Sequence, residues 1–428
     1  MPVVLRDCGH ARSQKGSSNT RPSPQGTRWM ADGQTMFDVD AALMTVIETE
    51  SSDLHLKVPA QPMVRRYGKL VPIEGSEQLR PEDTESTLFH MLTDEAKLEA
   101  FRAEREVDFS YSVPGVARFR VNAFVQRGSV SLVCRAIPFE IKTVDELLLP
   151  PVISEIADEE RGLILLTGTT GSGKSTTLAS MIDHINTGYA KHIVTIEDPV
   201  EFLHRDKTSI INQREVGEDT ASFARALRRV LRQDPDVILV GEMRDEETVR
   251  TALSAAETGH LVLSTIHTVD AAESVNRIID FFPQAEQRQA RAMLAGTLKA
   301  VISQRLVPTP DKNGRVATCE ILRMTGRVRD MIMNPEETGK LPEVISEGAY
   351  YGMQTFDQAL LYHVQQGRVS MEDALKAATH PHDFKLLVSS DGLRSTSVES
   401  VMTPDEPEDS GAAAANGAQP SVSGTPGA

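Results

Sequence analysis

Hydrophobic positions follow two different patterns along the chain and divide it into two parts. Between residues 34 and 150, Phe37–Glu50 has apolar residues at helical spacing, and short segments of alternating polar and apolar residues follow, separated by Gly and Pro. Such alternation is typical of half-buried antiparallel strands. From Ile153 onward, short continuous apolar runs alternate with helical segments, as in a parallel sheet flanked by helices. The patterns predict a small α+β domain over 34–150 and an α/β domain over 151–388.

The two ends of the chain show neither pattern. Residues 1–33 are polar and net basic, whereas residues 389–428 are acidic and rich in Ala, Gly, Pro and Ser. Segments of this composition do not bury enough apolar surface to fold, so we expect both to be disordered. Met30 and Met36 are alternative starts of the native chain, which mass spectrometry of its N-terminus would test.

The loop after the first apolar run of the second domain carries the most specific chemical signal. Gly168 is followed by four residues and then by Gly173, Lys174 and Ser175, between an apolar strand and a helical segment. This is the Walker A spacing in the context that the motif requires, which argues against a glycine-rich turn without a ligand. Backbone N–H groups and Lys174 would hold the phosphates of ATP, and the Ser175 hydroxyl would bind Mg2+. The predicted cofactor-binding residues are Gly168, Thr169, Thr170, Gly171, Ser172, Gly173, Lys174, Ser175 and Thr176.

Carboxylates follow two further apolar strands. One strand ends in Glu197, Asp198 and Glu201, and another, beginning at Val237, runs into Glu242. Ligands of an open parallel sheet bind at the carboxyl ends of its strands, so we expect acids at these ends to face Mg2+ or the water that attacks ATP. The alternative is a pair of solvated loops, which the phosphate loop upstream makes the weaker interpretation.

Two histidines flank a third apolar strand. His260 and His267 are seven residues apart, an odd separation that points them to opposite faces of a regular strand, so joint metal binding is not expected. His267 stands at the carboxyl end, where it could hydrogen-bond the γ-phosphate. A histidine satisfied in the core or at a subunit contact remains the alternative.

Arginines cluster in the strands of the first domain. Arg118 and Arg120 are two residues apart and therefore share a strand face, and Arg127 and Arg135 follow on the next turn and strand. On the pattern alone they are either ordinary surface arginines or a charge clamp on ATP.

Composition narrows the class of protein. A chain of 428 residues suits two domains, and a formal net charge of −16 counts against a nucleic-acid track. Cys8, Cys134 and Cys319 are dispersed and form no CxxC pair, so neither a zinc knuckle nor a disulfide framework is indicated. No apolar stretch is long enough for a membrane span, so we expect a cytoplasmic protein that contacts a membrane through a partner.

Together, the motifs GTTGSGKST, EDPVEF, VILVGEMRDEET and TGHLVLSTIHT, in that order, resemble those of the secretion-superfamily hexameric ATPases, and most of all the type IV pilus retraction ATPases of the PilT/PilU family. The resemblance covers Phe37 to Val388. It implies a RecA-like P-loop ATPase core preceded by a PAS-like domain, a homo-hexamer, and ATP bound between the two domains and near a neighbouring subunit. It further implies an inner-membrane pilus platform protein as partner, with a second retraction ATPase as a further candidate, and a place at the inner face of the membrane.

The resemblance also implies roles for the acidic residues. Lys174 and Ser175 match the residues that bind phosphate and Mg2+. Glu201 in the acidic box and Glu242 in the Walker B segment match residues that serve hydrolysis, with Glu242 also beside the metal. We therefore expect an ATP hydrolase.

Histidines and arginines are assigned in the same way. His260 and His267 match the histidine box of the family, and we expect His260 to contact the nucleotide and His267 to serve catalysis. Arg120 and Arg135 match arginines that the N-terminal domain offers to the phosphates, which favours the charge clamp over ordinary surface arginines.

The cysteines and some motif differences bear on the direction of force. Assembly ATPases of pili and of type II secretion typically carry a four-cysteine zinc site, which three dispersed cysteines cannot build, so retraction is favoured. GEMRD and STIHT resemble PilT, ISQRLVP and GMQTFDQAL resemble PilU, and Arg327–Met333 departs from the AIRNLI motif of PilT. The alternatives are an assembly ATPase, a low-turnover regulatory ring protein and, third, a nucleic-acid motor.

Overall fold

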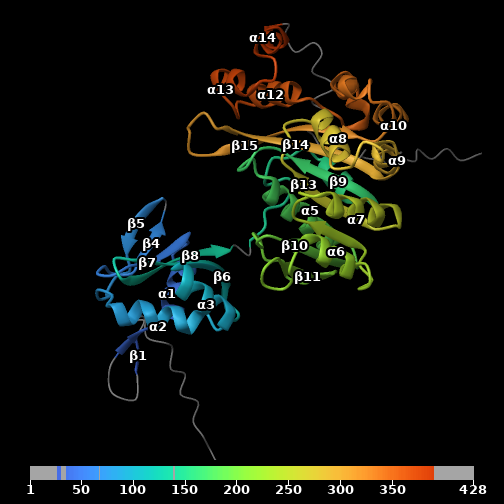
Figure 1. Cartoon of the computed structure of the whole chain (residues 1–428). Coiled ribbons are helices and arrows are strands. Elements are labelled where there is room, and N and C mark those ends of the chain that lie inside the picture. Colours follow the sequence, from blue (N-terminus) through green and yellow to red (C-terminus); the bar gives the residue numbers. More distant parts are fainter. Residues whose placement is uncertain (1–26, 30–34, 67, 138–139, 390–428) are drawn as a thin grey trace, which may run out of the picture. The chain divides into compact units, whose positions relative to one another are not determined.

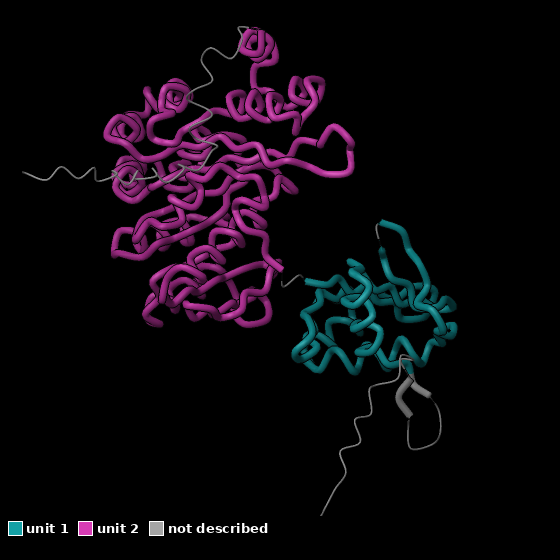
Figure 2. The backbone as a smooth tube through the Cα atoms, turned by 180° about the vertical axis from the view of Figure 1, so that it is seen from behind, with its two compact units in different colours: residues 1–139 teal, residues 140–428 magenta. Residues whose placement is uncertain are grey.

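The computed structural model describes residues 27–29, 35–66, 68–137 and 140–389 of the chain. The chain folds into two compact units, residues 1–139 and 140–428 (Figure 2). The boundary therefore lies before Glu140 rather than at the predicted position after Pro150. The reason is packing: Val144 and Leu149 are buried in the core of the second unit.

The first unit contains a six-stranded antiparallel sheet in the order β5-β4-β3-β8-β7-β6. Its strands are β3 (Asp53–Leu56), β4 (Met63–Arg66), β5 (Lys69–Pro72), β6 (Glu106–Val113), β7 (Ala117–Gln126) and β8 (Ser129–Ile137). Its helices are α1 (Val39–Glu48), α2 (Pro81–Met91) and α3 (Glu95–Glu104). This is the small α+β domain that the sequence pattern predicts.

A two-stranded antiparallel ribbon precedes this sheet. It consists of β1 (Thr27–Trp29) and β2 (Thr35–Phe37). Strand β1 falls within residues 1–33, for which the pattern predicts no structure, so the backbone pairing begins earlier than expected. The rest of that segment lies outside the described residues.

Strand β7 of the first unit has one buried and one polar face. Along β7, Phe119 and Val121 are fully buried, and they alternate with Arg118 and Arg120. The buried side chains pack with residues of α1 and α2 such as Leu43 in one apolar core. The arginines therefore share the opposite face, as their spacing predicts.

The second unit is built on a seven-stranded sheet in the order β11-β10-β12-β13-β9-β14-β15 (Figure 1). Neighbouring strands are parallel except β14 and β15, which form an antiparallel hairpin. The strands are β9 (Gly162–Thr167), β10 (His192–Glu197), β11 (Ile210–Glu215), β12 (Val237–Val240), β13 (Leu261–Ile266), β14 (Leu298–Pro308) and β15 (Arg315–Arg323). The predicted α/β fold is confirmed.

Helices cover both faces of this sheet. Leu163 and Leu165 of β9 pack on the side of α6 and α7, whereas Ile164 and Leu166 pack on the side of α4 and α5. Burial on both faces explains the continuous apolar run in the sequence. The helices are α4 (Val152–Ala157), α5 (Lys174–Gly188), α6 (Phe223–Val230), α7 (Glu246–Glu257), α8 (Ala271–Asp280), α9 (Gln287–Thr297), α10 (Gly326–Met333), η1 (Thr338–Lys340), α11 (Leu341–Glu347), η2 (Ala349–Tyr351), α12 (Phe356–Gln365), α13 (Met371–Ala377) and α14 (Pro381–Ser389).

The last helices pack on the β14–β15 hairpin. Val307 and Val316 of the hairpin share a small core with Leu360 of α12 and Phe384 of α14. The predicted acidic tail, 389–428, lies outside the described residues apart from Ser389. No helix in the described ranges is long and apolar enough to cross a membrane.

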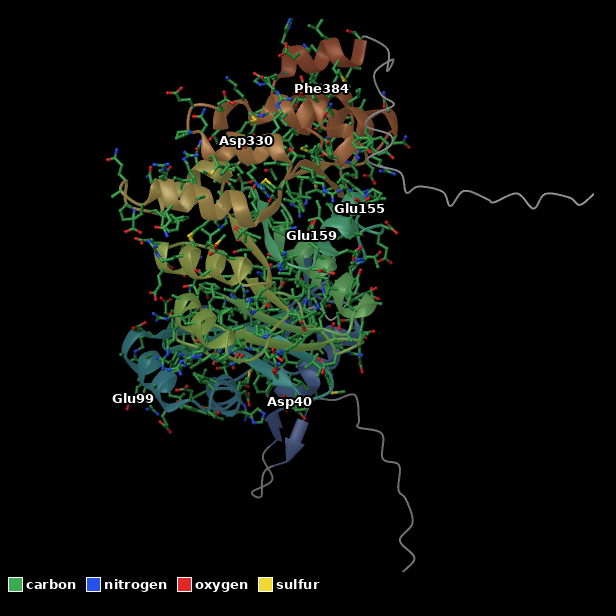
Figure 3. The ribbon with its side chains drawn as sticks, turned by 90° about the vertical axis from the view of Figure 1, so that its right-hand side faces the viewer. Asp40, Glu99, Glu155, Glu159, Asp330 and Phe384 are labelled. Carbon is green, nitrogen blue, oxygen red and sulfur yellow. The ribbon has the colours of Figure 1, made fainter. Side chains whose placement is uncertain are left out.

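Ion pairs fasten the first helix of the second unit to the same hairpin. Glu155 of α4 pairs with Arg323 of β15 at 2.9 Å, and Glu159, just after α4, pairs with Lys299 of β14 at 2.7 Å (Figure 3). Each unit also buries one cysteine in its core, Cys134 in the first and Cys319 in the second.

Candidate functional site

The carboxyl ends of the central strands meet at one edge of the sheet. Ile196 pairs with Val240, Val240 with Ser264, and Ser264 with Leu165, so β10, β12, β13 and β9 end side by side. A cleft of about 550 Å³ opens at this edge. Its lining includes Thr170, Gly171, Gly173, Lys174, Ser175, Thr176, Glu197, Asp198, Glu201, Glu242, Arg244, Thr265 and His267.

The phosphate loop turns sharply between β9 and α5. Gly168, Gly171 and Gly173 have φ angles of +140°, +79° and +90°, which side chains on L-residues rarely tolerate. Helix α5 begins at Lys174, so its N-terminus, with its unpaired N–H groups and partial positive charge, stands at the cleft. The arrangement suits a phosphate group, as the motif predicts.

Lys174 is buried in the centre of the site. Its ammonium donates hydrogen bonds to the carbonyl oxygens of Gly168 at 2.8 Å and Thr169 at 3.0 Å. Burial lowers the pKa of Lys174, and the nearby charges of Glu201 and Glu242 oppose this shift. The structure therefore brings the phosphate-loop lysine and both predicted acids together.

Glu242 lies just beyond β12 with little of its side chain exposed. Its carboxylate forms an ion pair with Arg244 and lies 3.5 Å from Nε2 of His267. Arg244 also approaches Asp198 at 4.0 Å. Arg244 was missed by the sequence reasoning, although its place in GEMRD, two residues after Glu242, was a usable signal.

The acids after β10 have different surroundings. Glu197 accepts hydrogen bonds from the hydroxyl of Thr195 at 2.6 Å and from the amide of Gln213 at 3.2 Å. Burial raises the pKa of Glu197. Glu201, in contrast, is exposed at the cleft. Glu197 is thus bound to side chains of β10 and β11, whereas Glu201 is the carboxylate available to a ligand.

The two histidines lie at opposite edges of the sheet. His267 follows the carboxyl end of β13 and lines the cleft. His260 precedes the amino end of β13, where its Nδ1 is 3.0 Å from the carbonyl oxygen of Ala255. A six-residue strand separates the two by roughly 20 Å. Within one chain His260 therefore lies away from the cleft, and its contact with the nucleotide stays a prediction.

Arg120 and Arg135 are directly opposite each other on β7 and β8 of the first unit. The Nε of Arg135 donates to Asp53 at 2.9 Å, and Arg65 approaches the other carboxylate oxygen at 3.6 Å. Burial by itself raises the pKa of Asp53, but hydrogen bonds from Ser52 and Arg135 hold it below its ordinary value. Asp53 thus orients Arg135, and the role of both arginines at the phosphates stays a prediction.

The oxygen donors of the cleft fit Mg2+ as a partner of bound phosphate. Magnesium usually binds through one or two carboxylates together with substrate phosphates rather than in an all-protein cage. Ser175, Glu201 and Glu242 offer such oxygens at the cleft. The described residues contain no cluster of three or more His, Cys, Asp or Glu that could hold a metal ion.

Comparison with known proteins agrees with this geometry. Residues 144–312 match a family model described as type II/IV secretion system protein. The chain is 44% identical over 348 residues to the type IV pilus retraction ATPase PilT of Pseudomonas aeruginosa, an alignment that covers 81% of this chain and all of that protein. It is 47% identical over 332 residues to a twitching motility protein of Neisseria gonorrhoeae, covering 78% of this chain and 88% of that protein.

A solved structure shows the same fold. The crystal structure of the pilus retraction motor PilT with bound ADP superposes with a TM-score of 0.74 at 44% identity, covering 81% of this chain and 99% of that one.

Proposed function

The chain belongs to the PilT/PilU family of type IV pilus retraction ATPases, and we propose that it hydrolyses ATP in the cleft at the phosphate loop to power pilus retraction and twitching motility. One observation carries the proposal: the segments that follow β9, β10, β12 and β13 bring Lys174, Glu201, Glu242 and His267 to a single cleft. A regulatory protein that only binds nucleotide would need Lys174 but not the two acids.

Binding of ATP rests on the loop and its helix. Loop N–H groups and the N-terminus of α5 hold the phosphates, and Lys174 exchanges its bonds to the Gly168 and Thr169 carbonyls for bonds to the outer phosphates. Ser175, with Glu242 nearby, would hold Mg2+, which neutralises charge on the outer phosphates.

Hydrolysis rests on the acids and on His267. Glu242, held by Arg244 and His267, orients the attacking water and accepts its proton. His267 stands at the same edge, where it can hydrogen-bond the γ-phosphate and register its loss. Glu201 adds a second carboxylate, which the positive charge of Lys174 attracts to the cleft.

Arg120 and Arg135 supply the proposed clamp on ATP from the first unit of the same or a neighbouring chain. Their side chains are adjacent across two strands, and Asp53 fixes the guanidinium of Arg135. Arginines that meet the γ-phosphate stabilise the transition state and are worth roughly 10³-fold or more in rate. Closing on ATP and opening after phosphate loss would then be the working stroke.

We further propose the assembly and partners that the family suggests. The chain would form a homo-hexamer at the cytoplasmic face of the inner membrane and act on a pilus platform protein there, with a second retraction ATPase as a further partner. The similarity to the retraction ATPase PilT over that relative's whole length supports this proposal.

Two substitutions test the chemistry in the purified full chain. Lys174→Ala should abolish ATP binding, and Glu242→Gln should retain binding but lower turnover by about 100-fold or more. Glu257→Gln, at an exposed position on α7, is the matched control and should turn over normally. ATP hydrolysis that survives both Lys174→Ala and Glu242→Gln would refute the catalytic assignment.

A clean deletion tests the direction of force. Cells that accumulate pili and lose twitching support retraction. Cells without surface pili would instead show that the chain drives assembly.

A further inference from the structure

Gln304 lies directly beneath the phosphate loop, and none of the roles described above uses it. It sits on β14 next to Ser303, which pairs with Thr167 at the end of β9. Gln304 is 2% exposed. Its amide nitrogen donates to the carbonyl oxygen of Ser172 at 2.9 Å, and its amide oxygen accepts from the hydroxyl of Thr177 at 2.8 Å. One side chain therefore joins the loop to the first turn of α5.

The glycines of the motif fit closely around this residue. A Cβ atom at Gly168 would lie 2.4 Å from the backbone oxygen of Gln304, and one at Gly173 would lie 2.7 Å from its amide nitrogen. Gly171, in contrast, has no heavy atom within 4 Å of the equivalent position. The phosphate loop thus packs closely against Gln304 at Gly168 and Gly173, whereas there is free space beside Gly171.

The hydrogen bond to Ser172 fixes the direction of a peptide plane. In a trans peptide the C=O of one residue and the N–H of the next point in opposite directions. Because the Ser172 carbonyl points to Gln304, the N–H of Gly173 points to the other side of the loop. Gly173 itself lines the cleft, so this orientation aims a donor at the phosphate site.

We propose that Gln304 is a positioning residue that holds the phosphate loop in its phosphate-binding conformation. The inference rests on the proposed function, since it assumes that the loop binds the phosphates of ATP. Without the amide, the Ser172–Gly173 peptide is free to rotate and the Ser172 carbonyl loses its partner. If the binding conformation falls to about one tenth of the population, the apparent Kd for nucleotide rises about tenfold.

The test compares two buried glutamines of the second unit. Gln354 is 1% exposed and donates to the carbonyl oxygen of Cys319 at 2.9 Å, and it does not line the cleft. Gln304→Leu and Gln354→Leu each remove one buried amide at similar volume, and the midpoint of thermal unfolding measures the loss of stability in each variant. In the full-length protein, calorimetric titration with ADP should show a Kd raised about tenfold for Gln304→Leu and unchanged for Gln354→Leu.

Thr177→Val provides a second variant that keeps the test decisive if Gln304→Leu does not fold. It removes the other hydrogen bond of Gln304 and should raise the Kd for ADP in the same direction, by about threefold. An ADP affinity within twofold of wild type for each of these variants that folds would overturn the inference. Failure of the wild-type protein to bind ADP would instead refute the proposed function itself.

Discussion

Gly168→Ala provides a direct test of how tightly the phosphate loop is confined. The added methyl group would meet the Gln304 carbonyl oxygen at 2.4 Å and the Ser172 hydroxyl at 2.6 Å, both closer than the 3.0 Å that real Cβ atoms keep. The first obstacle is backbone, so it cannot be relieved by a change of rotamer. The loop or β14 must move by roughly half an ångström, and overpacking of this kind costs about 1–3 kcal/mol. The φ of +140° adds strain of about 1–3 kcal/mol.

The expected result is a loss of about 3 kcal/mol or more in stability, together with at least a tenfold loss of ADP affinity, because the displaced N–H groups no longer surround the phosphate. Thermal unfolding and ADP titration of the full-length protein measure the two effects. Gly171→Ala is the matched control: its φ is +79° but its Cβ meets nothing, so backbone strain of about 1 kcal/mol is the whole cost in stability. Equal unfolding midpoints for the two variants would refute the reasoning.

Three further predictions concern groups outside the phosphate loop. Burial raises the pKa of Glu320 to about 7 from 4.5, although it accepts a hydrogen bond from the N–H of Ala271. The native state therefore binds more protons than the unfolded state between pH 4.5 and 7. The contribution of Glu320 to the free energy of unfolding falls by about 3 kcal/mol as the pH rises through this window. Glu320→Gln should remove this pH dependence, which urea unfolding at pH 5 and at pH 8 measures. Asp53→Asn should lower ATP turnover less than Arg135→Ala does, because the loss of the Asp53 carboxylate loosens the guanidinium of Arg135 without removing it. Equal turnover for Arg135→Ala and wild type would contradict the proposed arginine clamp on ATP. Phe384→Ala should cost about 3–5 kcal/mol of local packing and expose α14 to limited proteolysis ahead of the rest of the chain, an order that a protease time course would reveal.

Much of the site could be predicted because its signals are local. The phosphate loop, Glu242 and His267 each follow an apolar run directly, and parallel strands bring such positions to one edge without any knowledge of distant contacts. The shared face of Arg118 and Arg120 follows from the strand period in the same way.

The contact of Gln304 with the phosphate loop was not predicted, because it joins residues that are far apart in the sequence. Gln304 meets Ser172 across 132 residues of chain, and only the pairing of β14 with β9 brings them together. His260 is a different case: the motif match named it, and the length of β13 places it at the other end of that strand, so its contact with the nucleotide stays a prediction. The sequence predicts the domain boundary after Pro150, because the Pro pair there resembles a linker. The structure divides the chain after residue 139, because Val144 and Leu149 are buried in the core of the second unit.

The distribution of the described cysteines gives each unit its own chemical reporter. Cys134 and Cys319 are each at most 1% exposed, and burial raises the pKa of both thiols to about 12, so neither reacts in the folded chain. A thiol reagent therefore modifies Cys134 when the first unit opens and Cys319 when the second opens. Peptide mapping of the two adducts over time would give a separate opening rate for each unit in the intact chain, and added ATP should slow the modification of Cys319.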